Sequence, residues 1–118
     1  MTKPRRPPKA LLGEEARDSW FAVHTTEPHG RWRTEGRLWL TPTRLVFVPV
    51  AYGKLLQRLS WSCALGSVDD VEIAAPEPWA LNREPRGRLR LRSDGRTDWF
   101  QVRNPEEALA AIRTARSE

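Results

Sequence analysis

The chain has 118 residues, 39% of them hydrophobic and six of them tryptophan, which is enough to bury the core of one domain. A single cysteine excludes an intrachain disulfide, and no apolar run is long enough for a membrane-spanning helix or a signal peptide, so we expect a cytoplasmic protein. The formal net charge is +5, but four of the 20 basic residues lie among the first nine. The remaining 16 basic and 15 acidic residues nearly balance, which argues against a folded part built to bind nucleic acid.

Residues 1–10 contain those four cations, three prolines and no acidic residue. A segment of this composition cannot bury enough apolar surface to fold, so we predict a disordered basic tail followed by one domain over residues 11–118. The tail either keeps the protein in solution or tethers it electrostatically to anionic lipid or nucleic acid.

Short alternating runs separated by Gly and Pro predict an antiparallel β protein with strands at residues 19–25, 31–40, 44–50, 59–65, 68–74, 88–92 and 97–103. The stretch 36–48 is the clearest of these patterns. A turn centred on Pro42 and Thr43 would form a hairpin that pairs Leu38 with Phe47, Leu40 with Leu45 and Trp39 with Val46.

The second face of this hairpin carries Trp39, Val46 and Val48, and it is as apolar as the first. A strand that is apolar on both sides needs a cover on each. We expect this face to be covered by Leu11 and Leu12, by the loop around Trp79, or by a partner protein, including a second copy in a homodimer.

Asp94-Gly95 predicts a two-residue hairpin turn that places Leu89 opposite Phe100 and Arg90 opposite Trp99. Arg88, Arg90 and Arg92 then share the outer face. This row is either a solvated face with a cation–π pair between Arg90 and Trp99, or a platform for single-stranded nucleic acid.

Residues 104–116 predict a helix, because Asn104 can cap it, Pro105 suits its first position and Glu107 completes a capping box. Leu109 and Ile112 lie on its apolar stripe with three alanines. The predicted core comprises Leu38, Leu40, Leu45, Phe47, Leu89, Leu91, Phe100, Val102, Leu109 and Ile112.

The order Gly-x-Leu-aromatic-Leu-Thr-x-x-Arg-Leu-x-Phe over residues 36–47 resembles the central signature of GRAM domains. The following pieces fit in sequence, with a strand near Trp61, a hairpin around Asp94-Gly95 and a closing helix. The resemblance implies a mainly β, pleckstrin-homology-like antiparallel β-barrel or sandwich of about seven strands, closed by one C-terminal α-helix. It also implies a docking scaffold without catalysis.

Two further sites follow from the basic residues. His24, Arg31 and Arg33 resemble the pattern by which lipid-binding pleckstrin-homology domains hold phosphorylated headgroups, and two arginines one residue apart can fork onto one phosphate. Leu55 and Leu56, flanked by Lys54 and Arg58, either dip into a bilayer interface or belong to the core.

The sequence contains no phosphate-binding glycine loop and no nucleophile with a neighbouring base, so we expect no catalytic residues. His24, Glu27 and His29 match no metal-site spacing, and we expect neither a metal nor a cofactor. The function predicted is a non-catalytic module that docks a protein partner or an anionic membrane surface, at the inner face of the membrane in the second case. The alternative is a single-stranded nucleic-acid-binding β-domain that uses the arginine and tryptophan face.

Overall fold

The computed structural model describes residues 15–26, 33–49, 61–75 and 87–117. Within these ranges, eight elements and one short 3-10 turn follow each other, and their boundaries lie within a few residues of those predicted. They are β1 (Asp18–Thr25), β2 (Thr34–Leu40), β3 (Arg44–Pro49), β4 (Trp61–Ala64), η1 (Leu65–Ser67), β5 (Val68–Ala74), β6 (Arg88–Ser93), β7 (Arg96–Val102) and α3 (Pro105–Arg116). The predicted tail and the residues at 27–32, 50–60 and 76–86 lie outside the described ranges.

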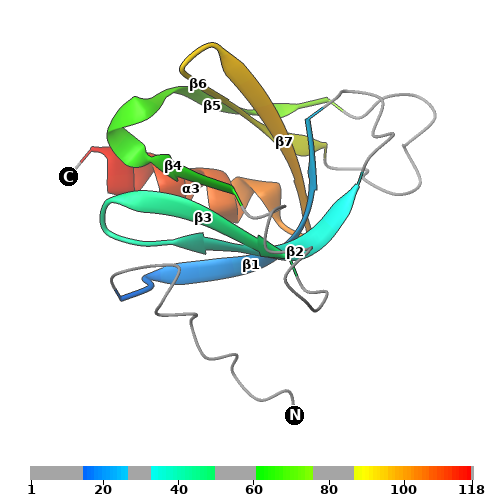
Figure 1. Cartoon of the computed structure of the whole chain (residues 1–118), viewed down its shortest axis with the longest axis horizontal. Coiled ribbons are helices and arrows are strands. Elements are labelled where there is room, and N and C mark those ends of the chain that lie inside the picture. Colours follow the sequence, from blue (N-terminus) through cyan, green and yellow to red (C-terminus); the bar gives the residue numbers. More distant parts are fainter. Residues whose placement is uncertain (1–14, 27–32, 50–60, 76–86, 118) are drawn as a thin grey trace.

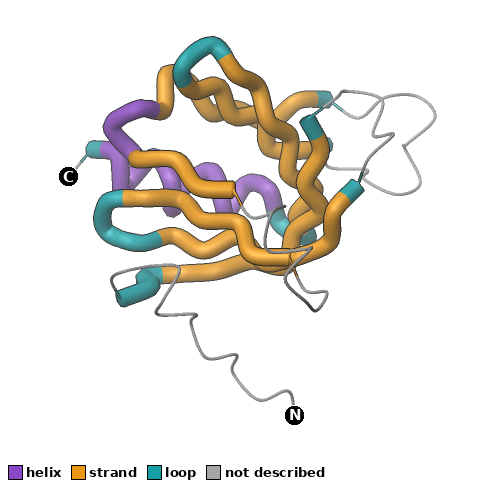
Figure 2. The backbone as a smooth tube through the Cα atoms, viewed as in Figure 1, coloured by secondary structure: helices purple, strands orange, loops and turns teal. Residues whose placement is uncertain are grey.

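The seven strands form one antiparallel sheet in the order β4-β3-β2-β1-β7-β6-β5. β1 is at the centre, where it pairs with β2 over nearly its whole length and with β7 only over Ala22 to Thr25. The sheet bends there and wraps around α3 (Figures 1 and 2). No ladder joins the edge strands β4 and β5 in the described part of the chain, so the predicted barrel is not closed and the sandwich-like alternative is correct.

The hairpin of β2 and β3 has the predicted register, with Leu38 opposite Phe47 and Leu40 opposite Leu45. Its turn is held by Thr41, whose Oγ1 accepts a hydrogen bond from the Arg44 amide at 2.9 Å. Gly36 sits where a side chain has no room, because a Cβ atom there would overlap the Val48 carbonyl oxygen and the Phe47 ring.

The hairpin of β6 and β7 also has the predicted pairs, Leu89 with Phe100 and Arg90 with Trp99. Its turn residues Asp94 and Gly95 have φ of 50° and 79°. Positive φ at both central residues is what a type I′ turn requires, and Asp-Gly is among the sequences that tolerate it best.

Helix α3 begins as predicted, with the Asn104 side chain accepting a hydrogen bond from the Glu107 amide at 3.2 Å. Arg113 and Arg116, near its end, donate to the carbonyl oxygens of Val71 and Val68, at 3.4 and 2.8 Å. These two bonds fasten the last turn of the helix to β5, a contact that the helical pattern alone did not predict.

The core lies between the bent sheet and α3. Nine of the ten residues predicted for it are buried, and the exception is Leu109, which is only partly buried and packs at the margin. The residues of α3 that face the sheet most directly are Ala108, Ile112 and Ala115, spaced by four and three positions. Leu109 is rotated about 100° from Ala108 and therefore falls at the side of this stripe.

Candidate functional site

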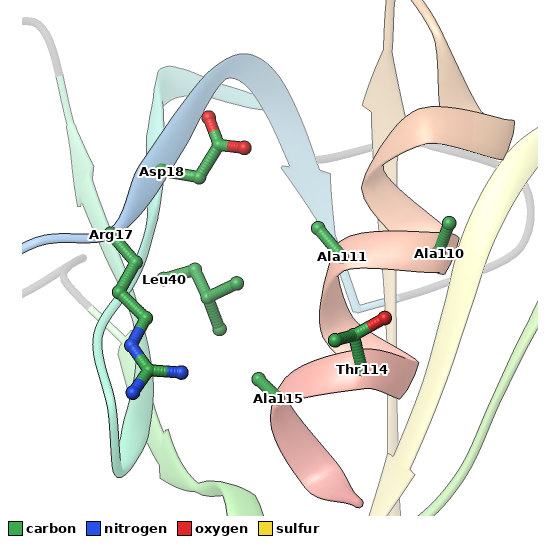
Figure 3. A pocket seen from close by; sticks show the side chains of 7 residues that line it. All are labelled: Arg17, Asp18, Leu40, Ala110, Ala111, Thr114 and Ala115. Carbon is green, nitrogen blue, oxygen red and sulfur yellow. The ribbon is translucent and has the colours of Figure 1, made fainter. Parts of the chain in front are cut away.

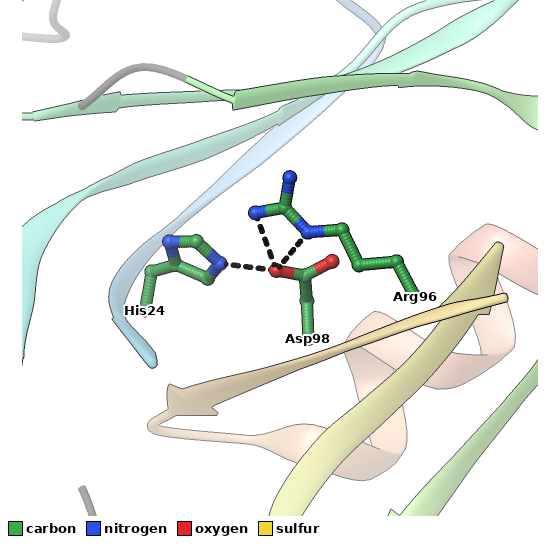
Figure 4. A network of polar contacts seen from close by, with 3 residues as sticks. All are labelled: His24, Arg96 and Asp98. Atoms are coloured by element: carbon green, nitrogen blue, oxygen red, sulfur yellow. Dashed lines mark hydrogen bonds and ion pairs between the residues drawn. The ribbon is translucent and has the colours of Figure 1, made fainter. Parts of the chain in front are cut away.

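The most polar site in the core is formed by His24, Asp98 and Arg96 (Figure 4). His24 Nε2 lies 2.7 Å from Asp98 Oδ1, and Arg96 donates to the same oxygen from Nε and Nη2 at 3.2 and 3.0 Å. Asp98 is fully buried, whereas the Arg96 side chain is 54% exposed. The other carboxylate oxygen, Oδ2, is buried and has no hydrogen-bond partner within the described residues. Two donors on one oxygen compensate part of the cost of burying this carboxylate.

Aromatic rings surround the His24 side chain. It stacks on Phe100 with 4.8 Å between ring centroids, and the rings of Phe47 and Trp61 lie at 5.2 and 6.1 Å. All of these rings lie on the core side of the sheet. His24 therefore faces the core and does not present a cation to a ligand in solvent.

This geometry separates His24 from the arginines with which the sequence grouped it. Arg33 is exposed just before β2, no contact joins it to His24, and Arg31 lies outside the described residues. The site predicted from His24, Arg31 and Arg33 stays a prediction, with the His24 ring on the core side of β1. The membrane-loop residues Lys54, Leu55, Leu56 and Arg58 also lie outside the described ranges.

Asp98 was missed by the sequence reasoning, although a signal for it existed. In β7 it has the same parity as Phe100, which the predicted register already placed in the core. A carboxylate on the inward face of a strand needs buried donors, and the short pairing of β1 with β7 brings one of them, His24, next to Asp98.

The outer face of the hairpin of β2 and β3, which carries Trp39 and Val46, is covered within one copy of the chain. Trp39 and Val46 are buried and form a small cluster with Ala16 and Val48. The guanidinium of Arg37 lies over the Trp39 ring, 5.7 Å from its centroid. Two of the three residues proposed as a partner or homodimer face, Trp39 and Val46, thus have little surface left for a second protein. The proposed covers Leu11, Leu12 and Trp79 lie outside the described residues.

An apolar side chain that the sequence analysis did not single out is exposed on the same side of the sheet. Phe21 in β1 is 49% exposed, and it is the only large hydrophobic side chain classed as exposed in the described ranges. Its position opposite Arg37 in the register of β1 and β2 places it beside the Trp39 cluster. The alternation of β1 held this signal, because Phe21 and Val23 are apolar on the side opposite Ala22 and His24.

The arginine row on β6 is not a uniform solvent-exposed platform. Arg88 is buried, Arg90 forms an ion pair with Glu72 on β5, and only Arg92 is exposed. The cation–π contact found within the described residues joins Arg37 to Trp39, where Arg90 and Trp99 had been expected. Cross-strand pairing of Arg90 with Glu72 therefore removes one of the cations on which the nucleic-acid alternative depended.

An open groove of about 310 Å³ lies between the start of β1 and α3 (Figure 3). The helix contributes three alanines and Thr114, and the sheet contributes Arg17, Asp18 and Leu40. Small side chains make the groove wide, but it has no set of polar groups that converge on one point, as ligand sites usually have.

No group of three or more histidine, cysteine, aspartate or glutamate side chains within the described residues could hold a metal ion. Cys63 is buried in the core. Of the helices among the described residues, none has the length and apolar character needed to cross a membrane.

Comparisons with known proteins identify the type of fold. No family model and no curated protein matches the sequence. Among solved structures, the C-terminal domain of an unknown protein from Leishmania infantum is similar over 92% of this chain and 90% of its own length, with a TM-score of 0.71 and 16% sequence identity.

Two pleckstrin-homology (PH) domains are also similar. The Vps36 N-terminal PH domain matches 90% of this chain and 81% of its own length, with a TM-score of 0.62 and 18% identity. The N-terminal PH domain of human ARAP2 matches 83% of this chain and 76% of its own length, with a TM-score of 0.60 and 11% identity. Likeness at this level of identity concerns the fold, and the chain therefore has a pleckstrin-homology-like fold.

Proposed function

We propose that this chain is a non-catalytic, GRAM-type docking module that holds a protein partner or an anionic membrane surface. The observation that carries the proposal is the likeness of nearly the whole chain to PH domains, which are binding modules. Internal pairing of the polar core supports it, because His24 and Asp98 bond to each other and not to a cleft open to substrate.

The GRAM part of the proposal rests on the hairpin signature, whose fixed positions have physical roles. Gly36 allows the close approach of β3, Leu38 and Phe47 fill the core, and Thr41 closes the turn. A substitution at any of these positions would disturb the hairpin of β2 and β3. That is the behaviour expected of a signature that specifies fold, with ligand choice left to the surface.

For the membrane arm, the relevant cations are the four in residues 1–9 together with Arg31 and Arg33. Each cation close to an anionic bilayer contributes about 1 kcal/mol. The tail would therefore supply weak attraction at a distance, and the two arginines would supply orientation at the sheet. This arm places the protein at the inner face of the membrane when it is bound.

The nucleic-acid alternative has less support, since Arg88 is buried and Arg90 is paired with Glu72. A direct comparison tests the membrane arm against the nucleic-acid alternative. The full chain is incubated with phosphatidylcholine vesicles, with vesicles that also contain phosphatidylserine or a phosphoinositide, and with oligothymidine. We expect binding to the anionic vesicles to exceed binding to oligothymidine. Saturable oligothymidine binding that is lost in Arg92→Gln or Trp99→Ala would replace the proposal by the alternative, and binding to no vesicle would remove the membrane arm.

A further inference from the structure

Phe21 is surface-exposed at the centre of the sheet, on the outer side of β1. A single exposed apolar side chain is common on protein surfaces and indicates nothing by itself. Phe21 differs from such a residue because it has a charged neighbour on the adjacent strand β2. Arg37 stands directly opposite Phe21 in the register, so the two Cβ atoms are about 5 Å apart on the same side of the sheet.

The Arg37 guanidinium is held in place before any partner arrives. Its Nε donates to Ser19 Oγ at 2.8 Å, and its Cζ lies 5.7 Å from the centroid of the Trp39 ring. Within the part of the chain that the structure describes, neither Nη nitrogen has a hydrogen-bond partner, and neither is a buried, unsatisfied atom. A fixed guanidinium with its two Nη donors accessible fits a carboxylate, and little side-chain entropy remains to be lost on binding.

The surroundings of Arg37 are apolar. On its other side, Arg37 is paired with the partly buried Val48 of β3, so Phe21, Arg37 and Val48 form one row across three strands. The acid nearest along β2 on the same side is Glu35, which is exposed and forms no ion pair with Arg37 among the described contacts. The row therefore presents one cation between two apolar side chains.

We infer that the row Phe21, Arg37 and Val48 docks a protein segment in which an acidic side chain stands beside a large apolar one. The carboxylate accepts hydrogen bonds from the Nη atoms of Arg37, and the apolar side chain covers Phe21. Phenylalanine and arginine are both enriched at the core of protein interfaces relative to the rest of the surface. A bilayer fits less well, because the row has one cation and lies beside the exposed Glu35. The inference rests on the docking function proposed above and defines its protein arm.

A random peptide library displayed on phage provides the probe. Peptides are selected on the wild-type chain alone, with no selection against any variant. We expect the enriched peptides to share an Asp or Glu next to a large apolar residue. A synthetic peptide with the enriched sequence should bind Phe21→Ser and Arg37→Gln at least about tenfold more weakly than wild type. Arg92→Gln, which removes an exposed arginine from β6, is the matched control and should bind as wild type does.

Several outcomes would overturn the inference. They are failure to enrich any peptide, enrichment of peptides without an acid, and equal affinity of wild type, Phe21→Ser and Arg37→Gln. Self-association of the wild type that Phe21→Ser abolishes would identify a second copy as the occupant, and loss of anionic-vesicle binding in Phe21→Ser would identify a bilayer. Thermal unfolding of each variant verifies that it is folded. If the docking function itself is wrong, neither vesicles nor peptides bind the wild-type chain. If only this surface is wrong, vesicles and peptides bind wild type, Phe21→Ser and Arg37→Gln equally.

Discussion

The geometry of the hairpin formed by β2 and β3 depends most on one residue, Gly36. An added Cβ would overlap the Val48 carbonyl oxygen, which is backbone and cannot rotate away. We predict that Gly36→Ala lowers the free energy of unfolding by about 1–3 kcal/mol, the usual cost of overpacking. Gly66→Ala is the control, because a Cβ there meets no atom within 4 Å. Equal urea midpoints for the two variants would show that β3 does not approach Gly36 this closely.

Asp98 is the residue on which the polar site in the core depends. Removing its carboxylate leaves His24 Nε2 without its acceptor among aromatic rings, while the half-exposed Arg96 can return to water. We therefore predict that Asp98→Ala costs about 2–4 kcal/mol of folding free energy.

The control for Asp98 is Asp70→Ala, which removes an exposed carboxylate from β5 and should change stability by less than about 0.5 kcal/mol. Denaturant titration of both variants measures the difference. A loss no larger in Asp98→Ala than in Asp70→Ala would mean that the network contributes nothing to stability.

Among the elements, α3 closes the core by inserting a narrow stripe of side chains into the bend of the sheet. Ile112 is fully buried and is the largest residue of that stripe. Ile112→Ala should cost about 2–4 kcal/mol, since it loses burial and leaves a cavity. Thr114→Ala, on the exposed side of the same helix, should be close to neutral. An unchanged urea midpoint for Ile112→Ala would contradict the docking of the helix.

The hairpin of β2 and β3 gives a second test at the element scale, because its outer face is covered from within the chain. Val46→Glu places a charge in the Trp39 cluster and should lower the unfolding midpoint clearly, by about 2 kcal/mol or more. Ser62→Glu, on the exposed residue paired with Val46 across β3 and β4, is the control. Sedimentation of both variants reports the oligomeric state. A Val46→Glu chain as stable as Ser62→Glu would mean that the cover is absent in solution.

Across the whole molecule, the sequence was sufficient for the features that depend on local periodicity. Alternation predicted the strands and both hairpin registers, and capping residues predicted the start of α3. The functional surfaces depend on pairings distant in sequence. The hydrogen-bond partner of His24 is Asp98, 74 residues away, and the cluster that covers Trp39 includes Ala16. No single-strand pattern contains that information, so the candidate sites were predicted less well than the fold.

At this scale the cations proposed for membrane binding are the four in residues 1–9 together with Arg31 and Arg33. Arg31→Ala with Arg33→Ala should abolish any preference for phosphoinositide over phosphatidylserine vesicles, because two guanidinium groups one residue apart can bind one phosphate. Removing residues 1–9 should instead weaken binding to all anionic vesicles alike.

The measurement that tests the docking account most directly is co-sedimentation of the full chain and the chain lacking residues 1–9 with phosphatidylserine vesicles at increasing salt. In the proposed mechanism the tail acts through its four cations, and the reach of a charge in water falls to roughly 8 Å at physiological ionic strength. We predict that binding of the full chain falls steeply with salt and that the shortened chain binds at least about tenfold more weakly at low salt. Binding that persists undiminished at high salt, or that is equal for the two chains, would contradict electrostatic docking at a membrane.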